Sequence, residues 1–223
     1  MRSMFSTIAP TYDRLNRIIS LRLDQRWRRL AIAQLDWQRA PGGIYLDLCA
    51  GTMDFSAILA VQPGFRGRIA GADFAQPMLA HGRHKTDRAV PVTSDALALP
   101  FADASFDGAM LGWGARNFED LDAGLIEAAR VLAPGARLVM LDMSTPSAQP
   151  LRGIFRAYFE HVLPRIGRLI SKHRSAYSWL PESTRVFPEP AALARRLEQA
   201  GFRDVSFSRF LGGVTALHVA TRV

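Results

Sequence analysis

The chain has 223 residues, of which 48% are hydrophobic and 22% are charged, and its net charge at pH 7 is +8. This length suits one sizeable α/β domain, residues 1–223, and is short for two complete ones. No apolar run approaches the roughly 18 residues of a membrane span, and residues 1–12 lack the apolar core of a signal peptide, so we expect a cytoplasmic protein. The single cysteine, Cys49, excludes an internal disulfide, and without a Cys/His cluster we expect no metal site.

Two segments carry most of the positive charge. Residues 14–39 hold seven arginines against two aspartates, and residues 151–185 hold seven basic residues against two glutamates. These charges alternate with apolar side chains, a pattern that suits transient contact with an anionic membrane surface. A basic face that is only solvated would give the same pattern, as would a nucleic-acid-binding face. Because no RNA-binding module is recognisable, we do not expect a nucleic acid partner.

The middle of the chain alternates short apolar runs with amphipathic stretches. The runs predict strands at Ile44–Leu48, Arg68–Asp73, Val90–Asp95, Phe106–Trp113 and Ala136–Met143. The stretches between them predict helices near 54–62, 75–85 and 121–132. Such alternation is typical of βαβ units, in which helices cover both faces of a parallel sheet.

The end of the chain has a different pattern. After a predicted helix at 189–200, closed by Gly201, two strand-like runs at Phe202–Phe210 and Val214–Val223 flank Gly212-Gly213. This pattern indicates a hairpin, so we expect the last two strands to pair antiparallel. A Rossmann-like, mostly parallel seven-stranded sheet that ends in an antiparallel hairpin is the outline of class I S-adenosylmethionine-dependent methyltransferases. It is not the outline of a nicotinamide dehydrogenase.

Two segments fall outside this α/β core. Residues 1–39 form a predicted helical segment before the first strand, and residues 145–187 interrupt the path from the fifth strand to the last helix. Ligands of open α/β sheets bind beyond the carboxyl ends of the strands, where an insertion after the fifth strand emerges. We therefore expect residues 145–187 to form a helical lid.

The loop after the first strand predicts a cofactor site. Residues 47–54 read Asp-Leu-Cys-Ala-Gly-Thr-Met-Asp, and their small side chains allow a tight turn before a helix N-terminus. Asp73 follows Gly51 by 22 residues, where an acidic side chain accepts hydrogen bonds from a ribose diol. Asp95 ends the third predicted strand, where a carboxylate can receive an adenine amino group. Each aspartate alone is equally compatible with a helix cap or a surface charge.

Several blocks resemble the ubiquinone/menaquinone biosynthesis C-methyltransferase family (UbiE/MenG type), and the likeness spans nearly the whole chain. The blocks that carry it are Met4–Asp13, Asn16–Ser20, Gly114–Phe118, Arg130–Gly135, His161–Gly167, Tyr177–Ser183 and Gly212–His218. The resemblance implies S-adenosylmethionine as cofactor. It places the cofactor site on Asp47, Gly51, Thr52, Asp73, Asp95, Ala96 and Gly112. Two positions depart from the family pattern: Met53 replaces a usual glycine, and Gly112 stands where a hydroxyl residue is common.

The reaction that the resemblance implies is methyl transfer to a ring carbon of a prenylated quinol, with a benzoquinol and a naphthoquinol both possible. A ring carbon becomes nucleophilic when a neighbouring phenol loses its proton, so the enzyme must orient the ring and favour the phenolate. Arg116 is a candidate to stabilise the phenolate or orient a water, although it also fits a structural ion pair. Tyr177 and His161 are further catalytic candidates, although an aromatic residue in a lid more often packs, and the apolar helical stripe around His161 favours a structural role for it. The alternative substrate is another aromatic or polyketide-like small molecule, and a homodimer is possible.

An apolar stripe runs through the predicted lid. It comprises Leu151, Ile154, Phe155, Tyr158, Phe159, Val162, Leu163, Ile166 and Ile170, at three- and four-residue spacing. Four arginines occupy the rest of the helical wheel, and Pro164 is expected to kink the helix. A stripe of this kind usually faces a core. Beside the mouth of the site it would also suit passage of a prenyl tail.

Overall fold

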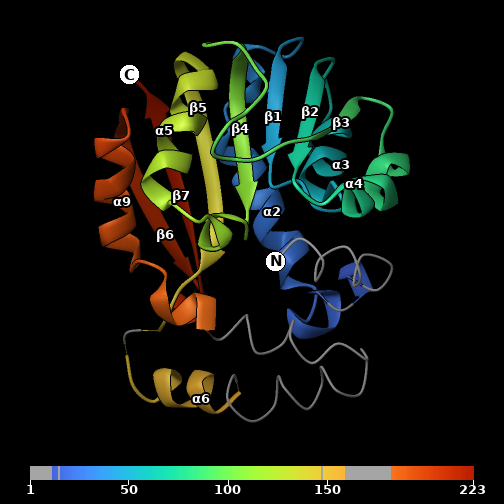
Figure 1. Ribbon diagram of the computed structural model, residues 1–223. Helices are drawn as coiled ribbons and strands as arrows, with labels where there is room; N and C mark the ends of the chain where they lie inside the picture. Colours follow the sequence, from blue (N-terminus) through green and yellow to red (C-terminus); the bar gives the residue numbers. More distant parts are fainter. Residues whose placement is uncertain (1–11, 15, 147, 159–181) are drawn as a thin grey trace.

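The computed structural model describes residues 12–14, 16–146, 148–158 and 182–223. A seven-stranded sheet has the order β3-β2-β1-β4-β5-β7-β6, which leaves β3 and β6 at its two edges (Figure 1). The strands are β1 (Ile44–Leu48), β2 (Arg68–Asp73), β3 (Ala89–Thr93), β4 (Phe106–Gly112), β5 (Leu132–Met143), β6 (Phe202–Phe210) and β7 (Thr215–Arg222). Only β7 runs antiparallel to its neighbours β5 and β6. The predicted fold, including the terminal hairpin, is confirmed.

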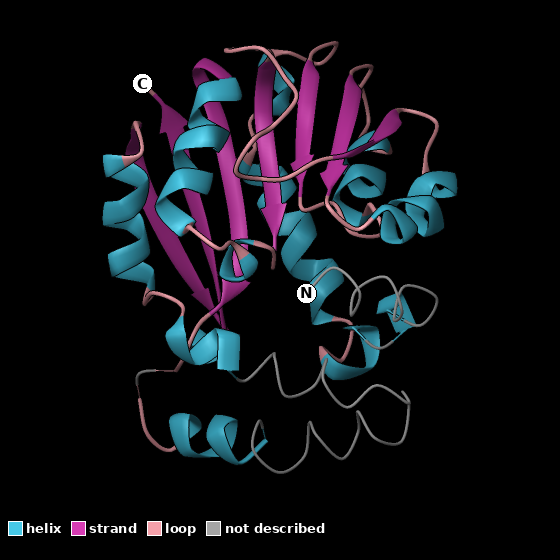
Figure 2. Ribbon diagram, in the orientation of Figure 1, coloured by secondary structure: helices cyan, strands magenta, loops and turns pink. Residues whose placement is uncertain are grey.

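Helices cover both faces of the sheet (Figure 2). The helices are α2 (Leu23–Gln34), α3 (Asp54–Ala60), α4 (Gln76–Gly82), α5 (Leu121–Val131), α6 (Leu151–Ala157) and α9 (Pro190–Gln199). Successive residues of β1 serve opposite faces: Leu46 joins the core beneath α5 and α9, whereas Tyr45 joins the core beneath α2 and α3. This double burial explains why β1 reads as an apolar run without polar alternation.

The structure differs from the predicted boundaries by more than one residue at two strands, β3 and β5, and by one residue at an end of β4 and at both ends of β7. Strand β5 begins at Leu132, four residues earlier than expected, because Leu132 pairs with Phe106 before the register shifts at a bulge. Strand β3 ends at Thr93, and Asp95 instead forms an isolated bridge with Ala98 in the following loop. Asp95 is therefore held by a loop and not by the sheet.

Of the two segments predicted to lie outside the core, α2 instead packs on the sheet, whereas residues 16–22 and α6 lie near the lower end of the sheet in Figure 1. Helix α6 lies there, and the Tyr158 hydroxyl just after it donates to the Ile19 carbonyl at 3.5 Å. A Cβ atom added to Gly212 would clash with the Leu151 side chain, so α6 also packs against the β6–β7 turn. Residues 182–186 are helical, and the rest of the predicted apolar stripe, 159–181, lies outside the described residues. Among the described helices, none is long and apolar enough to cross a membrane.

Candidate cofactor and substrate site

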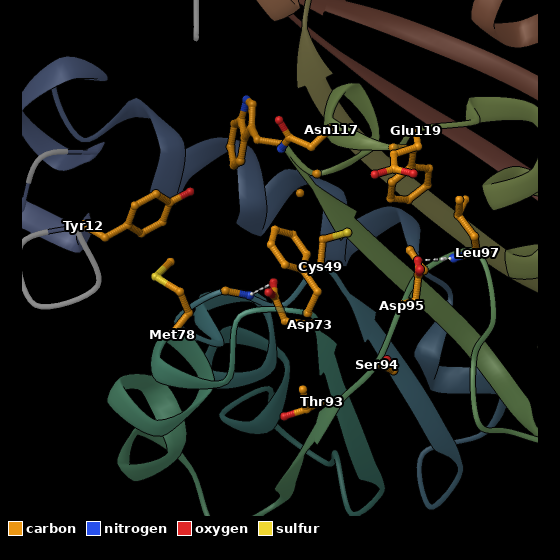
Figure 3. Close-up of a pocket in the computed structure, with 17 residues that line it drawn as sticks. Tyr12, Cys49, Asp73, Met78, Thr93, Ser94, Asp95, Leu97, Asn117 and Glu119 are labelled. Carbon is orange, nitrogen blue, oxygen red and sulfur yellow. Dashed lines mark hydrogen bonds between the residues drawn. The ribbon is translucent and has the colours of Figure 1, made fainter. Parts of the chain in front are cut away.

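A pocket of about 610 Å³ opens at the carboxyl ends of the parallel strands, the usual ligand position in such sheets (Figure 3). Its wall combines the loops after β1, β2, β3 and β4 with one side chain from the N-terminal segment. The lining residues are Tyr12, Cys49, Gly51, Asp73, Phe74, Met78, Thr93, Ser94, Asp95, Ala96, Leu97, Gly112, Trp113, Gly114, Asn117, Phe118 and Glu119. Five of the seven predicted cofactor residues lie in this wall.

The loop after β1 is a sharp turn with left-handed backbone at Cys49, Gly51 and Met53. Gly51 lines the pocket, and its lack of a side chain lets a ligand approach the backbone. The Met53 side chain is fully buried in the core and packs against Gly71, where an added Cβ would lie 2.9 Å from the methionine Cε. The departure at position 53 therefore places its side chain in the core, while the loop keeps the positive φ that glycine would favour.

Asp73 links the two loops that face each other across the pocket floor. Its Oδ2 accepts from the Gly51 N–H at 2.9 Å and its Oδ1 accepts from the Ala75 N–H at 2.8 Å. Burial raises the pKa of Asp73, against the two hydrogen bonds, which favour the charged form. The carboxylate is thus fixed at the wall, with lone pairs left to receive ligand hydroxyls.

The opposite part of the wall follows β3. Asp95 is exposed, and its Oδ1 accepts from the Leu97 N–H at 2.9 Å, which orients the carboxylate at the pocket (Figure 3). Ala96 lies beside it, and Ser94 has a buried hydroxyl without a hydrogen-bond partner. These groups suit a polar, flat ligand part such as an adenine ring.

Asp47 and Thr52 lie behind the wall. The Asp47 carboxylate accepts from the Ser56 N–H at 2.9 Å and from the Ser56 hydroxyl at 2.6 Å. Burial raises the pKa of Asp47 to about 6, despite the hydrogen bonds from Ser56. Thr52 donates its hydroxyl proton to Asp13. Both side chains hydrogen-bond to other protein groups, so in this structure they stabilise the conformation of the loop.

Glycine is a steric requirement at the last residue of β4 and again two residues later. A Cβ on Gly112 would lie 2.7 Å from the Phe55 ring, and one on Gly114 would clash with the Cys49 Cβ. Phe55 thus takes up the space that a hydroxyl side chain at position 112 would need. Trp113 lies between these glycines with φ of 55° and lines the pocket.

Of the predicted catalytic residues, only Arg116 is described. Its guanidinium donates from one terminal nitrogen to Asp142 Oδ1 at 2.8 Å and to the Trp113 carbonyl at 2.6 Å. The ion pair is buried, and Arg116 stands one residue before Asn117, which lines the pocket. Tyr177 and His161 lie outside the described residues.

Several lining residues were not among the predicted cofactor positions. Cys49 lies in the wall, where burial and the nearby charge of Asp73 raise the pKa of its thiol well above the ordinary value. Trp113, Asn117 and Glu119 follow β4 and also line the pocket, and Figure 3 shows Asn117 and Glu119 there. Their position directly after a strand end was the one available signal. Nothing in their spacing distinguishes them from ordinary loop residues.

The pocket fits S-adenosylmethionine. Its volume lies in the range of small-molecule sites, and its floor offers the oriented carboxylates of Asp73 and Asp95 and the open backbone at Gly51. Tyr12 and Trp113 add aromatic side chains to the same wall.

Comparison with solved structures supports the fold. A methyltransferase from Thermotoga maritima, described as S-adenosylmethionine-dependent and a possible histamine N-methyltransferase, superposes with a TM-score of 0.69 over the full length of both chains at 18% identity. A putative methyltransferase from Haloferax volcanii, solved with the Trm112 methyltransferase activator, gives a TM-score of 0.70 at 18% identity over 97% of this chain and 96% of that chain.

Sequence comparison is more specific. A demethylmenaquinone methyltransferase from Thermus thermophilus is 46% identical over 98% of this chain and 100% of the relative. One from Lactiplantibacillus plantarum is 40% identical over 100% of this chain and 95% of the relative. The model of the ubiE/COQ5 methyltransferase family matches residues 1–222. The chain therefore belongs to the ubiE/COQ5 methyltransferase family and is an S-adenosylmethionine-dependent methyltransferase.

Proposed function

We propose that the protein methylates a ring carbon of demethylmenaquinol in respiratory quinone biosynthesis. The observation that carries this proposal is the 46% identity, over the full length, to a relative named demethylmenaquinone methyltransferase. The aromatic side chains of the pocket support it, because the rings of Tyr12, Phe74, Trp113 and Phe118 all line the wall. Flat aromatic substrates bind favourably between such side chains.

The chemistry requires the chain to orient the ring and to favour a phenolate. When bound, S-adenosylmethionine supplies an electrophilic methyl group, so the protein needs neither a nucleophilic side chain nor a metal for the transfer. Holding the quinol carbon in line with this methyl lowers the barrier by pre-ordering the two reactants. Favouring the phenolate raises electron density at the neighbouring ring carbon.

We assign the phenolate-stabilising role to Arg116. Asp142 and the carbonyl of the wall residue Trp113 fix its guanidinium, so an oriented cation lies directly behind the pocket wall. Arg116→Ala is expected to lower kcat with little change in the KM for quinol, because the interaction forms mainly in the transition state. Asp142→Asn, which keeps Arg116 but removes its anionic partner, should reduce kcat less. An Arg116→Ala enzyme with normal turnover would transfer the role to Tyr177 or His161.

The substrate proposal is tested by methylation of matched quinols. The purified protein, S-adenosylmethionine with a labelled methyl group and a chemically reduced demethylmenaquinone should yield a product labelled on the ring carbon. A prenylated benzoquinol is the second arm, because it tests the ubiquinone branch, and a non-prenylated aromatic is the third. Labelling on a phenolic oxygen, or labelling of the third substrate alone, would refute the proposal.

We further propose that the basic, apolar end of the molecule contacts an anionic membrane surface to receive the prenyl tail. Leu21, Ile154 and Leu211 are exposed there, on segments joined by the Tyr158–Ile19 hydrogen bond and the packing of Leu151 against Gly212. Exposed arginines stand on the same segments, at positions 17, 22, 152 and 209. Each basic residue near an anionic leaflet contributes at most about 1 kcal/mol, which favours reversible contact.

A matched pair of variants tests the membrane contact. Ile154 is 62% exposed on α6 and Ile126 is 56% exposed on α5, so both accept serine with little loss of stability. Ile154→Ser is expected to weaken sedimentation with anionic vesicles and to raise KM for long-tailed quinols more than for short-tailed ones, whereas Ile126→Ser should change neither. Vesicle binding should also fade as salt rises. If the two variants showed the same vesicle binding and the same KM values, α6 would not be part of the membrane contact.

A further inference from the structure

A partly buried ion cluster ties the N-terminal segment to the cofactor loops. The Lys85 ammonium, in the 3₁₀ turn after α4, donates to Asp13 Oδ2 at 2.6 Å and to Asp54 Oδ1 at 2.5 Å. All three side chains are at most 17% exposed. Asp13 also accepts from the Thr52 hydroxyl in the loop after β1. One lysine therefore holds together two carboxylates, from residues 41 positions apart, that are largely shielded from solvent.

The cluster continues into α2. The Gln25 amide donates to Asp54 Oδ2 at 3.1 Å and to Asp24 Oδ2 at 3.2 Å, and Arg28 pairs with Asp24 at 2.8 Å. Burial alone would raise the pKa of Asp54, but the charges of Arg28 and Lys85 outweigh it and hold the pKa below its ordinary value. Asp54 thus has further partners on α2. Asp13 is the carboxylate of the cluster that comes from the N-terminal segment.

The neighbour of Asp13 forms part of the pocket. Tyr12 lines it, and the Tyr12 ring packs with Phe74 against Ala75 and Met78. Figure 3 shows this ring on the side of the pocket opposite Glu119, above the loop that holds Asp73. Tyr12 belongs to the N-terminal segment, which is not part of the sheet. The position of the Tyr12 ring therefore depends on the contacts that its neighbour Asp13 makes.

We propose that Lys85 is a positioning residue: by pairing with Asp13 it holds Tyr12 over the cofactor, and so sets how tightly S-adenosylmethionine and S-adenosylhomocysteine are retained. Lys85 does not line the pocket. Without its ammonium, Asp13 and Asp54 face each other as like charges, and the N-terminal segment moves away from the loop. The proposal rests on the cofactor site and not on the identity of the quinol.

The decisive measurement is binding of S-adenosylhomocysteine to the full-length protein by calorimetry. If the closed position of Tyr12 falls to about a tenth of the population, the apparent Kd rises about tenfold, because affinity scales with the competent fraction. Lys85→Met is expected to show this rise, with kcat at saturating S-adenosylmethionine within about twofold of the original. Lys85→Arg, which keeps the charge, should restore most of the affinity. Arg83→Met, at an exposed position in the same turn, is the matched control and should bind normally.

Hydrogen exchange separates positioning from general loss of structure. In Lys85→Met the amides of residues 12–20 should exchange faster and lose their protection by S-adenosylhomocysteine, while β1 and β4 exchange as before. If Lys85→Met does not fold, Asp13→Asn, which removes one charge and keeps the side-chain shape, makes the same prediction. Combining the two substitutions should weaken binding no more than either alone, since both break one contact. Unchanged affinity in either variant, or faster exchange throughout the sheet, would overturn the proposal. Neither of these results would bear on quinol methylation, which is tested separately by the labelled product.

Discussion

At the scale of single residues, Asp73 has the most demanding position in the site. Two backbone N–H groups hold its carboxylate while it faces the pocket. Asp73→Ala is expected to weaken S-adenosylmethionine binding by roughly 1–3 kcal/mol, because ligand hydroxyls would lose their acceptor in a buried place. Calorimetry checks this, with Asp87→Ala at an exposed position as control. An unchanged affinity of Asp73→Ala would show that Asp73 does not bind the ribose hydroxyls.

Asp47 makes the stability of the protein depend on pH. Its pKa rises from the ordinary 3.8 to about 6 on folding, so the folded state binds more protons than the unfolded state between these values. The free energy of unfolding therefore falls as pH rises through this window, by on the order of 3 kcal/mol from this group. Asp47→Asn keeps an acceptor for both Ser56 donors, which share one oxygen. Urea unfolding should give Asp47→Asn a larger free energy of unfolding than the original protein above about pH 6, where Asp47 is charged in both states. Below pH 3.8 the two proteins should be about equally stable. A constant difference would contradict the assignment.

At the scale of elements, the contact between α3 and β4 compensates for the glycine at position 112. Gly112→Ser would place an atom 2.7 Å from the Phe55 ring, and overpacking of this kind costs about 1–3 kcal/mol. Adding Phe55→Leu should recover much of that loss by making room. Thermal unfolding of the two single variants and the double variant measures the coupling. Additive effects would mean that the two residues do not compete for space.

The elements were predictable from sequence where burial sets the pattern. Strands β1, β2 and β6 have the predicted bounds, because apolar runs buried on both faces, or a hairpin bounded by glycines, leave little choice of register. The start of β5 was missed because Leu132 and its neighbours sit at a bulge, which depends on the partner strand. The sequence around Leu132 does not show which strand will pair with it, so it does not predict the bulge.

The site was predictable only in part, for a related reason. Gly51, Asp73, Asp95, Ala96 and Gly112 lie in the wall as spacing or the family resemblance implied. The hydrogen bonds that draw Asp47 to Ser56 join different elements, so no single motif contains them. The cluster around Lys85 joins residues from three separate segments and has no signature in the sequence.

At the scale of the whole molecule, cofactor binding should stabilise the fold. A ligand that binds only the folded state adds about 2.7 kcal/mol at a concentration one hundred times its Kd. S-adenosylhomocysteine is therefore expected to raise the Tm of the full-length protein, and the rise should shrink in Asp73→Ala and in Lys85→Met. Scanning calorimetry over a ligand series checks this. A Tm independent of ligand would mean that the pocket is not the cofactor site.

The order of the sheet also bears on how the protein behaves at high concentration. A sheet with open edges can recruit strands from other molecules, and the two edges here are β3 and β6. Pro91 in β3 has no N–H to offer, and β6 exposes Arg203, Asp204 and Arg209 along its length. Both edges are thereby poor templates for a further strand, so crowding of many copies is expected to leave the sheets separate and the protein free of edge-to-edge aggregates.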